Sequence, residues 1–76
     1  MTEERKKSLV NNLRKLGYER NKQVRLYGAD YALTSDPMIV GDRLVVIDAT
    51  ERKSGQTTRI RIPLTILIAA SQNLAA

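Results

Sequence analysis

Residues 57–70 read TTRIRIPLTILIAA, and the pattern of side chains changes at Pro63. Before the proline, polar residues and isoleucine alternate, as they do in a strand with one polar and one apolar face. Beyond it, Leu64, Leu67 and Ile68 recur at helical spacing. Proline ends a strand because it lacks the N–H donor, and its fixed φ suits the first turn of a helix. The chain is therefore predicted to pass from strand to helix at this residue.

The strand is predicted to cover about 57–62 and the helix about 63–73. A single bulged strand over 57–69 is the competing interpretation, because Thr65 and Ile66 are β-branched and favour extended backbone. The helix is preferred because the apolar positions beyond the proline repeat with the period of a helix rather than that of a strand.

A second strand is predicted at about 43–52, where RLVVIDATER contains an apolar block that is typical of a central strand. A turn around Gly55 would join it to the strand at 57–62. Loops of two or four residues there give one register, in which isoleucines share a face and Asp48 lies opposite Arg61 on the other face. A three-residue loop would mix the two faces and is rejected.

The N-terminal part of the chain is predicted to form an amphipathic helix at about 3–16. Leu9, Leu13 and Leu16 make one apolar stripe at spacings of four and three residues. Gly17 directly follows the last of these leucines, in the position where glycine commonly ends a helix.

Residues 23–27 and 30–35 alternate with a period of two and are predicted to form a hairpin. The pair Gly28–Ala29 fits a two-residue type II′ turn, because glycine accepts the positive φ of the first turn position. This turn would place Leu26 opposite Tyr31 and would gather the large side chains of the hairpin on one face.

Together these elements predict one α+β domain over residues 1–76. An N-terminal helix precedes an antiparallel meander of three to five short strands, and a C-terminal helix packs on the same face of the sheet. If the sheet curls, Leu44 and Val46 become interior and the domain approaches a small SH3-like barrel.

The composition limits the class of protein. The chain has 76 residues, a size that buries only about 60% of the unfolded surface, and it contains neither cysteine nor histidine. Disulfides and the usual zinc ligands are therefore excluded. The segment MTEERKKSLV lacks the apolar core of a signal peptide, and the apolar run at 62–70 is about half the length of a membrane span. We expect a cytoplasmic protein that does not enter a membrane.

Catalytic chemistry is not expected. The commonest general base and the thiol nucleophile are absent, and no base accompanies the serines. Asp30, Asp36, Asp42 and Asp48 recur every six residues, which could indicate a metal site. That interpretation is not preferred, because aspartate is favoured in turns and this spacing matches no calcium loop. The glycines stand singly, so no phosphate-cradling loop is present. We therefore expect neither an enzyme nor a bound metal, cofactor or small-molecule substrate.

The formal net charge of +5 and the pI near 10.0 favour an anionic partner. On the predicted sheet face away from the helices, arginine gathers beside an exposed tyrosine, and this combination can hold phosphates and stack a base. The residues predicted to contact nucleic acid are Arg25, Tyr27, Arg52, Lys53, Arg59 and Arg61. The first hypothesis is therefore a non-enzymatic module that binds the nucleic-acid backbone.

The same face also suits a protein partner or a second copy of the chain. Its centre would be apolar and its rim arginine-rich, and tyrosine and arginine are enriched in protein interfaces. The residues predicted for this alternative interface are Tyr27, Tyr31, Leu44 and Val46. Self-association would also stabilise a domain with so small a core.

Overall fold

The computed structural model describes residues 3–41 and 44–72. The elements in chain order are α1 (Glu3–Lys15), β1 (Gln23–Leu26), β2 (Ala29–Leu33), β3 (Met38–Val40), β4 (Leu44–Glu51), β5 (Thr57–Arg61) and α2 (Leu64–Gln72). The described residues form an α+β fold, as predicted, in which two helices flank a five-stranded antiparallel sheet in the sequence. The predicted strand start at residue 43 and the predicted helix end at residue 73 lie outside the described residues.

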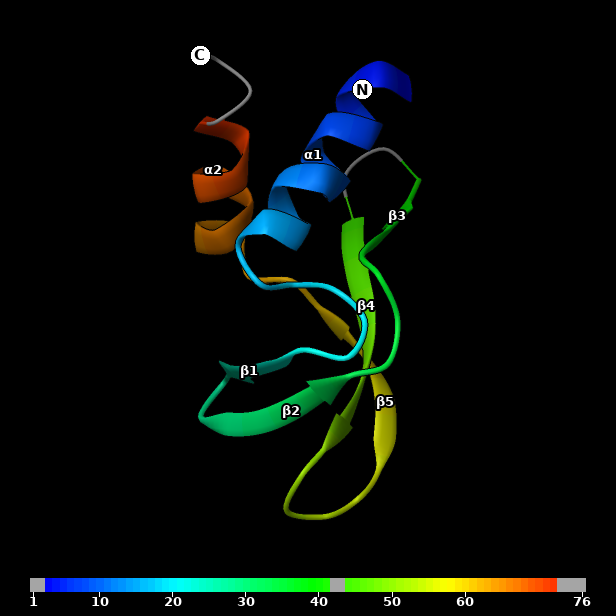
Figure 1. Ribbon diagram of the computed structural model, residues 1–76, viewed down its shortest axis with the longest axis vertical. Helices are drawn as coiled ribbons and strands as arrows, with labels where there is room; N and C mark the ends of the chain where they lie inside the picture. The colour runs from blue at the N-terminus through cyan, green and yellow to red at the C-terminus, as the bar shows by residue number, and fades with distance from the viewer. Residues whose placement is uncertain (1–2, 42–43, 73–76) are drawn as a thin grey trace.

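The central strand of the sheet is β4. One of its edges pairs with β2 and then with β3, the other pairs with β5, and β1 extends the sheet beyond β2. The sheet stays open and does not close into the barrel considered above. In Figure 1 the β1–β2 hairpin lies across the lower half of the molecule, at a steep angle to β4.

The strand β3 was not predicted, because the second strand was expected to end at Ser35. In the structure the chain leaves the sheet between β2 and β3, and this break interrupts the pairing along only one edge of β4. Thr34 N–H donates to the carbonyl of Asp48 (2.8 Å), and pairing resumes with Met38 opposite Val46. Between these points Ser35 Oγ accepts the N–H of Asp48 (3.0 Å). A side-chain oxygen therefore replaces one ladder acceptor where the strand is broken.

The predicted register of the first hairpin is wrong. Leu26 pairs with Ala29 and not with Tyr31. The two turn residues are Tyr27 and Gly28, whose φ angles of 53° and 75° are both positive, as a type I′ turn requires. A type I′ turn suits glycine at its second position, so the turn begins one residue earlier than predicted.

The predicted register of the β4–β5 hairpin is also wrong. Asp48 lies opposite Arg59, and Arg61 lies opposite Val46. The loop covers residues 52–55 and ends with Gly55 at φ 73°. The predicted four-residue loop, 53–56, placed this glycine one position earlier, although its left-handed backbone is needed at the last position. The predicted two-residue loop, 54–55, placed the glycine last but is shorter than the loop in the structure.

Neither error changes the face on which a side chain lies. Each one moves the pairing by two positions, and side chains alternate between faces with a period of two. Ile60 accordingly packs against the core and Arg59 is exposed, so the predicted sorting of isoleucine and arginine is confirmed.

The change from strand to helix at Pro63 is confirmed. The proline carbonyl accepts hydrogen bonds from the N–H groups of Ile66 (3.0 Å) and Leu67 (3.1 Å), so Pro63 caps the helix that begins at Leu64. The competing interpretation, a bulged strand over 57–69, is wrong because the backbone beyond the proline finds its partners within a helix.

The core lies between the helices and one face of the sheet. Figure 1 shows α1 and α2 side by side at the upper end of the molecule. The buried residues of the core cluster are Leu9, Leu13, Tyr18, Leu26, Leu33, Val45, Ile47, Ala49, Ile62 and Ala70. On β4 these are alternate residues, so the other alternate set, which includes Asp48 and Thr50, belongs to the opposite face.

Candidate functional site

Four arginines from three segments share the sheet face opposite the helices. Arg25 lies on β1, Arg59 and Arg61 lie on β5, and Arg52 directly follows β4. The pairing of Arg25 with Asp30, and of Arg59 with Asp48, puts these side chains on the face that the core does not use. We call the four residues Arg25, Arg52, Arg59 and Arg61 the arginine face.

Arg59 forms an ion pair with an acidic residue. Its Nε donates to Asp48 Oδ1 at 2.9 Å, directly across the β4–β5 ladder. The hydrogen bond to this carboxylate and its charge raise the pKa of the Arg59 guanidinium above its ordinary value. Arg59 therefore contributes less free positive charge than the sequence suggested, whereas Arg61 is released from the acid that was predicted to face it.

Arg52 has a neutral partner. Its Nη1 donates to Gln23 Oε1 at 2.9 Å, and its main-chain N–H donates to the carbonyl of Asp30 at 2.9 Å. These two bonds fasten the start of the β4–β5 loop to the β1–β2 hairpin. Lys53 follows in the same loop and is exposed.

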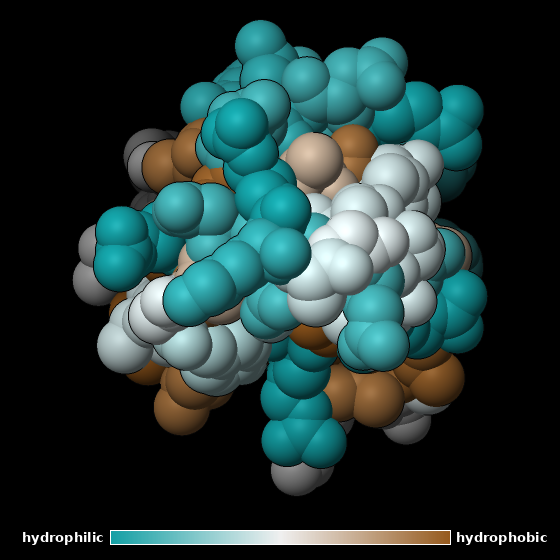
Figure 2. Space-filling model, turned by 90° about the horizontal axis from the view of Figure 1, so that it is seen from below, coloured by the Kyte–Doolittle hydropathy of each residue, from teal (hydrophilic) through white to brown (hydrophobic). Residues whose placement is uncertain are grey.

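A shallow hollow lies between this loop and the β1–β2 turn. Its lining residues are Gly28, Ala29, Asp30, Glu51, Arg52 and Lys53. Figure 2 looks onto this end of the molecule, where hydrophilic side chains cross the middle of the view and most of the hydrophobic surface lies toward its margins. The end formed by the two hairpins is thus polar, with acids and bases side by side.

Arg25 and Arg61 are the members of the arginine face whose guanidinium groups have no side-chain partner among the described residues. Within the described residues, neither guanidinium makes a hydrogen bond or an ion pair with another side chain. Both side chains are exposed. Asp30 lies opposite Arg25 in the ladder, but the N–H donors of both guanidinium groups remain available to an anion, so these two arginines are the strongest candidates for contact with a ligand.

Tyr27 was predicted to lie on a strand, but in the structure it lies in the β1–β2 turn. Its hydroxyl donates to the main-chain carbonyl of Arg61 at 2.7 Å and so links the β1–β2 turn to the last residue of β5. The residue is nevertheless 65% exposed. The structure therefore brings Tyr27 to the arginine face, although through a contact that the sequence pattern does not reveal.

The predicted apolar centre of this face is largely covered. Val46 is only 6% exposed, and it lies between Met38 and Arg61 on the neighbouring strands. Leu44 is half-buried. Tyr31 is on the other face, where it packs against the core. The four residues of the alternative interface are thus not gathered into one exposed patch.

An exposed apolar surface occurs instead on α2, where it was not predicted. Leu64 and Ile68 are 70% and 49% exposed and lie one helical turn apart. The sequence contains a sign of this surface, because Leu64–Gln72 has no charged residue and its only polar residues, Thr65, Ser71 and Gln72, are too few to form a polar outer face.

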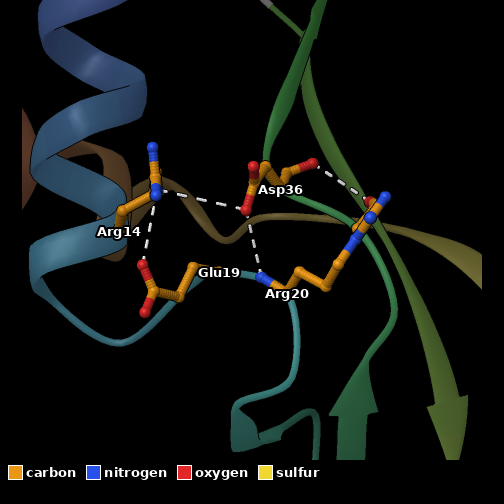
Figure 3. Close-up of polar contacts among 5 residues, drawn as sticks. Arg14, Glu19, Arg20 and Asp36 are labelled. Carbon is orange, nitrogen blue, oxygen red and sulfur yellow. Dashed lines mark hydrogen bonds and ion pairs between the residues drawn. The ribbon is translucent and has the colours of Figure 1, made fainter.

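A polar network fastens the connection between β2 and β3 to the end of α1. Arg14 Nε lies 3.3 Å from Glu19 Oε2 and 4.0 Å from Asp36 Oδ1, and the main-chain N–H of Arg20 donates to the same aspartate oxygen at 3.1 Å. Figure 3 shows these groups converging while the Arg20 side chain points away from them. Every acid here has a partner, so the network is structural.

The metal-site interpretation of the aspartates finds no support in the described part of the chain. Asp30, Asp36 and Asp48 do not belong to any group of three or more side chains that could hold an ion there. Asp42 lies outside the described residues. Neither described helix is long and apolar enough to cross a membrane.

Comparisons with protein-family models, with curated proteins and with solved structures find no match for this chain. Its function has to be inferred from the arrangement of its own side chains.

Proposed function

We propose that the protein is a small non-enzymatic module that binds the phosphate backbone of nucleic acid through the arginine face. The observation that carries this proposal is that Arg25 and Arg61 lie on one face and that, among the described residues, their guanidinium groups have no side-chain partner. Arginine recognises phosphate through a planar fork of donors, and an arginine without an internal partner is free to do so. Such a protein would act in the cytoplasm, where nucleic acid is accessible.

The remaining charges support a backbone contact rather than recognition of a single anion. Arg52 and Lys53 extend the basic surface toward the loop, while Asp48 offsets Arg59 near its centre. Arg52 and Lys53 line the shallow hollow together with two acids, and the other basic groups are spread along the face outside it. A polymer with evenly spaced phosphates can contact such a surface at several points.

The salt dependence of binding tests this proposal. A labelled oligonucleotide is titrated with protein at several salt concentrations, and the logarithm of the affinity is plotted against the logarithm of salt. The double variant Arg25→Gln with Arg61→Gln should lower the slope by about two, because each phosphate contact releases roughly one counterion. A slope equal to that of the wild type would contradict the proposal.

The matched control removes two positive charges from another surface. Lys7 and Lys15 on α1 are exposed, and the double variant Lys7→Gln with Lys15→Gln has the same net charge as the arginine variant. It should leave the slope within about half a unit of the wild type. An equal loss in both double variants would show that net charge alone attracts the nucleic acid.

A second candidate function is self-association through α2. Leu64 and Ile68 present an exposed apolar stripe, and no charged side chain of α2 would oppose its counterpart in a second copy. Two chains of net charge +5 can therefore meet there without direct repulsion. Sedimentation should show a concentration-dependent mass that Leu64→Lys abolishes, and a monomer at all concentrations would exclude this function.

A further inference from the structure

The backbone of Tyr27 has an unusual conformation. Its φ of 53° is in the left-handed region, which bulky residues rarely occupy. Asparagine or glycine is the usual residue at the first position of a type I′ turn. A tyrosine at this position therefore does not follow from the needs of the turn, and its side chain requires another explanation.

The tyrosine ring is held at both ends. Its main chain is fixed by the tight turn, and its hydroxyl is bonded to the carbonyl of Arg61. That carbonyl points away from β4, because Ile62 and its alternate neighbours on β5 make the ladder bonds. The ring thus reaches the free edge of β5, yet the residue remains 65% exposed.

Arg25 and Arg61, whose guanidinium groups have no side-chain partner among the described residues, are both connected to Tyr27. Arg25 precedes Tyr27 by two residues in the β1 hairpin, and Arg61 supplies the carbonyl that binds the tyrosine hydroxyl. Arg52 and Arg59, by contrast, use their guanidinium groups in bonds to Gln23 and Asp48. An exposed aromatic ring is therefore accompanied by the two arginines that are free to bind phosphate.

We propose that the ligand is single-stranded nucleic acid, with an unpaired base stacked on Tyr27 and phosphates held by Arg25 and Arg61. This inference rests on the proposed function. In a duplex the bases stack on one another and offer no free face to a protein ring, whereas a single strand does. The fixed ring loses little side-chain entropy on binding, which favours its use as a stacking platform.

Three fluorescent ligands test this inference by anisotropy with the full chain: an oligothymidylate, a sugar–phosphate strand of the same length without bases, and a duplex of the same length. The wild type should bind the oligothymidylate at least about fivefold more tightly than the strand without bases, because stacking on an aromatic ring has this magnitude. Equal affinity for these two strands, or tighter binding of the duplex, would overturn the inference.

Two variants at residue 27 separate the effect of the aromatic ring from that of the hydroxyl group. Tyr27→Leu should weaken binding of the oligothymidylate at least about fivefold and leave binding of the strand without bases unchanged. Tyr27→Phe retains the ring and should retain most of the preference for bases. If phenylalanine loses the preference as completely as leucine, the hydroxyl bond and not the ring is responsible, and the inference fails.

The outcomes also distinguish this inference from the function on which it rests. If none of the three ligands binds in a salt-dependent manner, nucleic-acid binding itself is excluded. If all three bind with a steep salt dependence and with equal affinity, the backbone contact stands and only the stacking of an unpaired base is overturned.

Discussion

The side-chain amide of Asn12 in α1 donates a hydrogen bond of 3.1 Å to the main-chain carbonyl of Ala70 in α2, and both residues are buried. Ala70 lies in the last turn of its helix, where carbonyl groups lack intrahelical donors. One polar side chain therefore joins the two helices and satisfies a carbonyl that would otherwise lie unpaired in the core.

Replacing Asn12 by alanine should lower the free energy of unfolding by about 2 kcal/mol, because it leaves a buried carbonyl without a donor. Urea denaturation measures the loss. The control is Asn11→Ala, which changes the exposed neighbour on the same helix and should shift stability by less than about 0.5 kcal/mol. Similar losses in the two variants would show that the bond to Ala70 is not what stabilises the pair of helices.

Ser35 completes the edge of β4 at the break between β2 and β3, where its Oγ accepts the N–H of Asp48. Ser35→Ala should lower the free energy of unfolding by about 1–2 kcal/mol, since the partly buried N–H loses its acceptor. Ser54 is the matched control because its Oγ accepts the N–H of Gln56 in an exposed loop. If Ser54→Ala has as large an effect on the urea midpoint, the special role of Ser35 is refuted.

The stability of the protein should fall above about pH 10 because of Tyr18. Burial disfavours the charged phenolate and raises the pKa of this tyrosine from its ordinary value of 10.0. As the pH rises past 10.0, the unfolded chain releases the proton while the folded chain keeps it, so stability decreases until the folded pKa is passed.

Tyr18→Phe removes this titration, and urea denaturation across the alkaline range measures the difference. The variant and the wild type should be similarly stable at neutral pH, where both side chains are uncharged. Above pH 10 the wild type should lose stability relative to the variant. Parallel stability curves throughout this range would be inconsistent with the burial of the phenol.

Removing the acid that pairs with Arg59 should improve nucleic-acid binding. Asp48→Asn eliminates the charge that holds Arg59, so this guanidinium becomes available to a phosphate. The slope of log affinity against log salt should become steeper by about one. Glu4→Gln makes the same charge change on exposed α1 and serves as the control. Equal gains in the two variants would attribute the effect to net charge and not to release of Arg59.

The residues that form the two helices and four of the five strands could be recognised from the sequence because the evidence for them is local. The period of two up to Ile62, the proline at 63 and the helical spacing after it are all features of one short stretch. The face on which each arginine lies follows from the same alternation, and it survives both errors of register.

The partners across the strands depend on turn geometry, which sequence spacing leaves open. Gly28 is compatible with either position of a two-residue turn, and only the twist of the finished hairpin selects the second. The ion pair of Asp48 with Arg59 and the freedom of Arg61 result from a similar choice at Gly55. A small change in turn position therefore redistributes the charges of the candidate site.

The amino-acid sequence alone determined the helices, four of the five strands and the inner or outer orientation of their side chains, since these depend on periodicity within a few neighbouring residues. Only the tertiary structure decided that the hydroxyl of Tyr27 reaches the carbonyl of Arg61 and that Val46 is covered. Both facts depend on how the sheet bends between strands far apart in the chain. That bend is set by packing of the whole domain and leaves no periodic trace in the sequence.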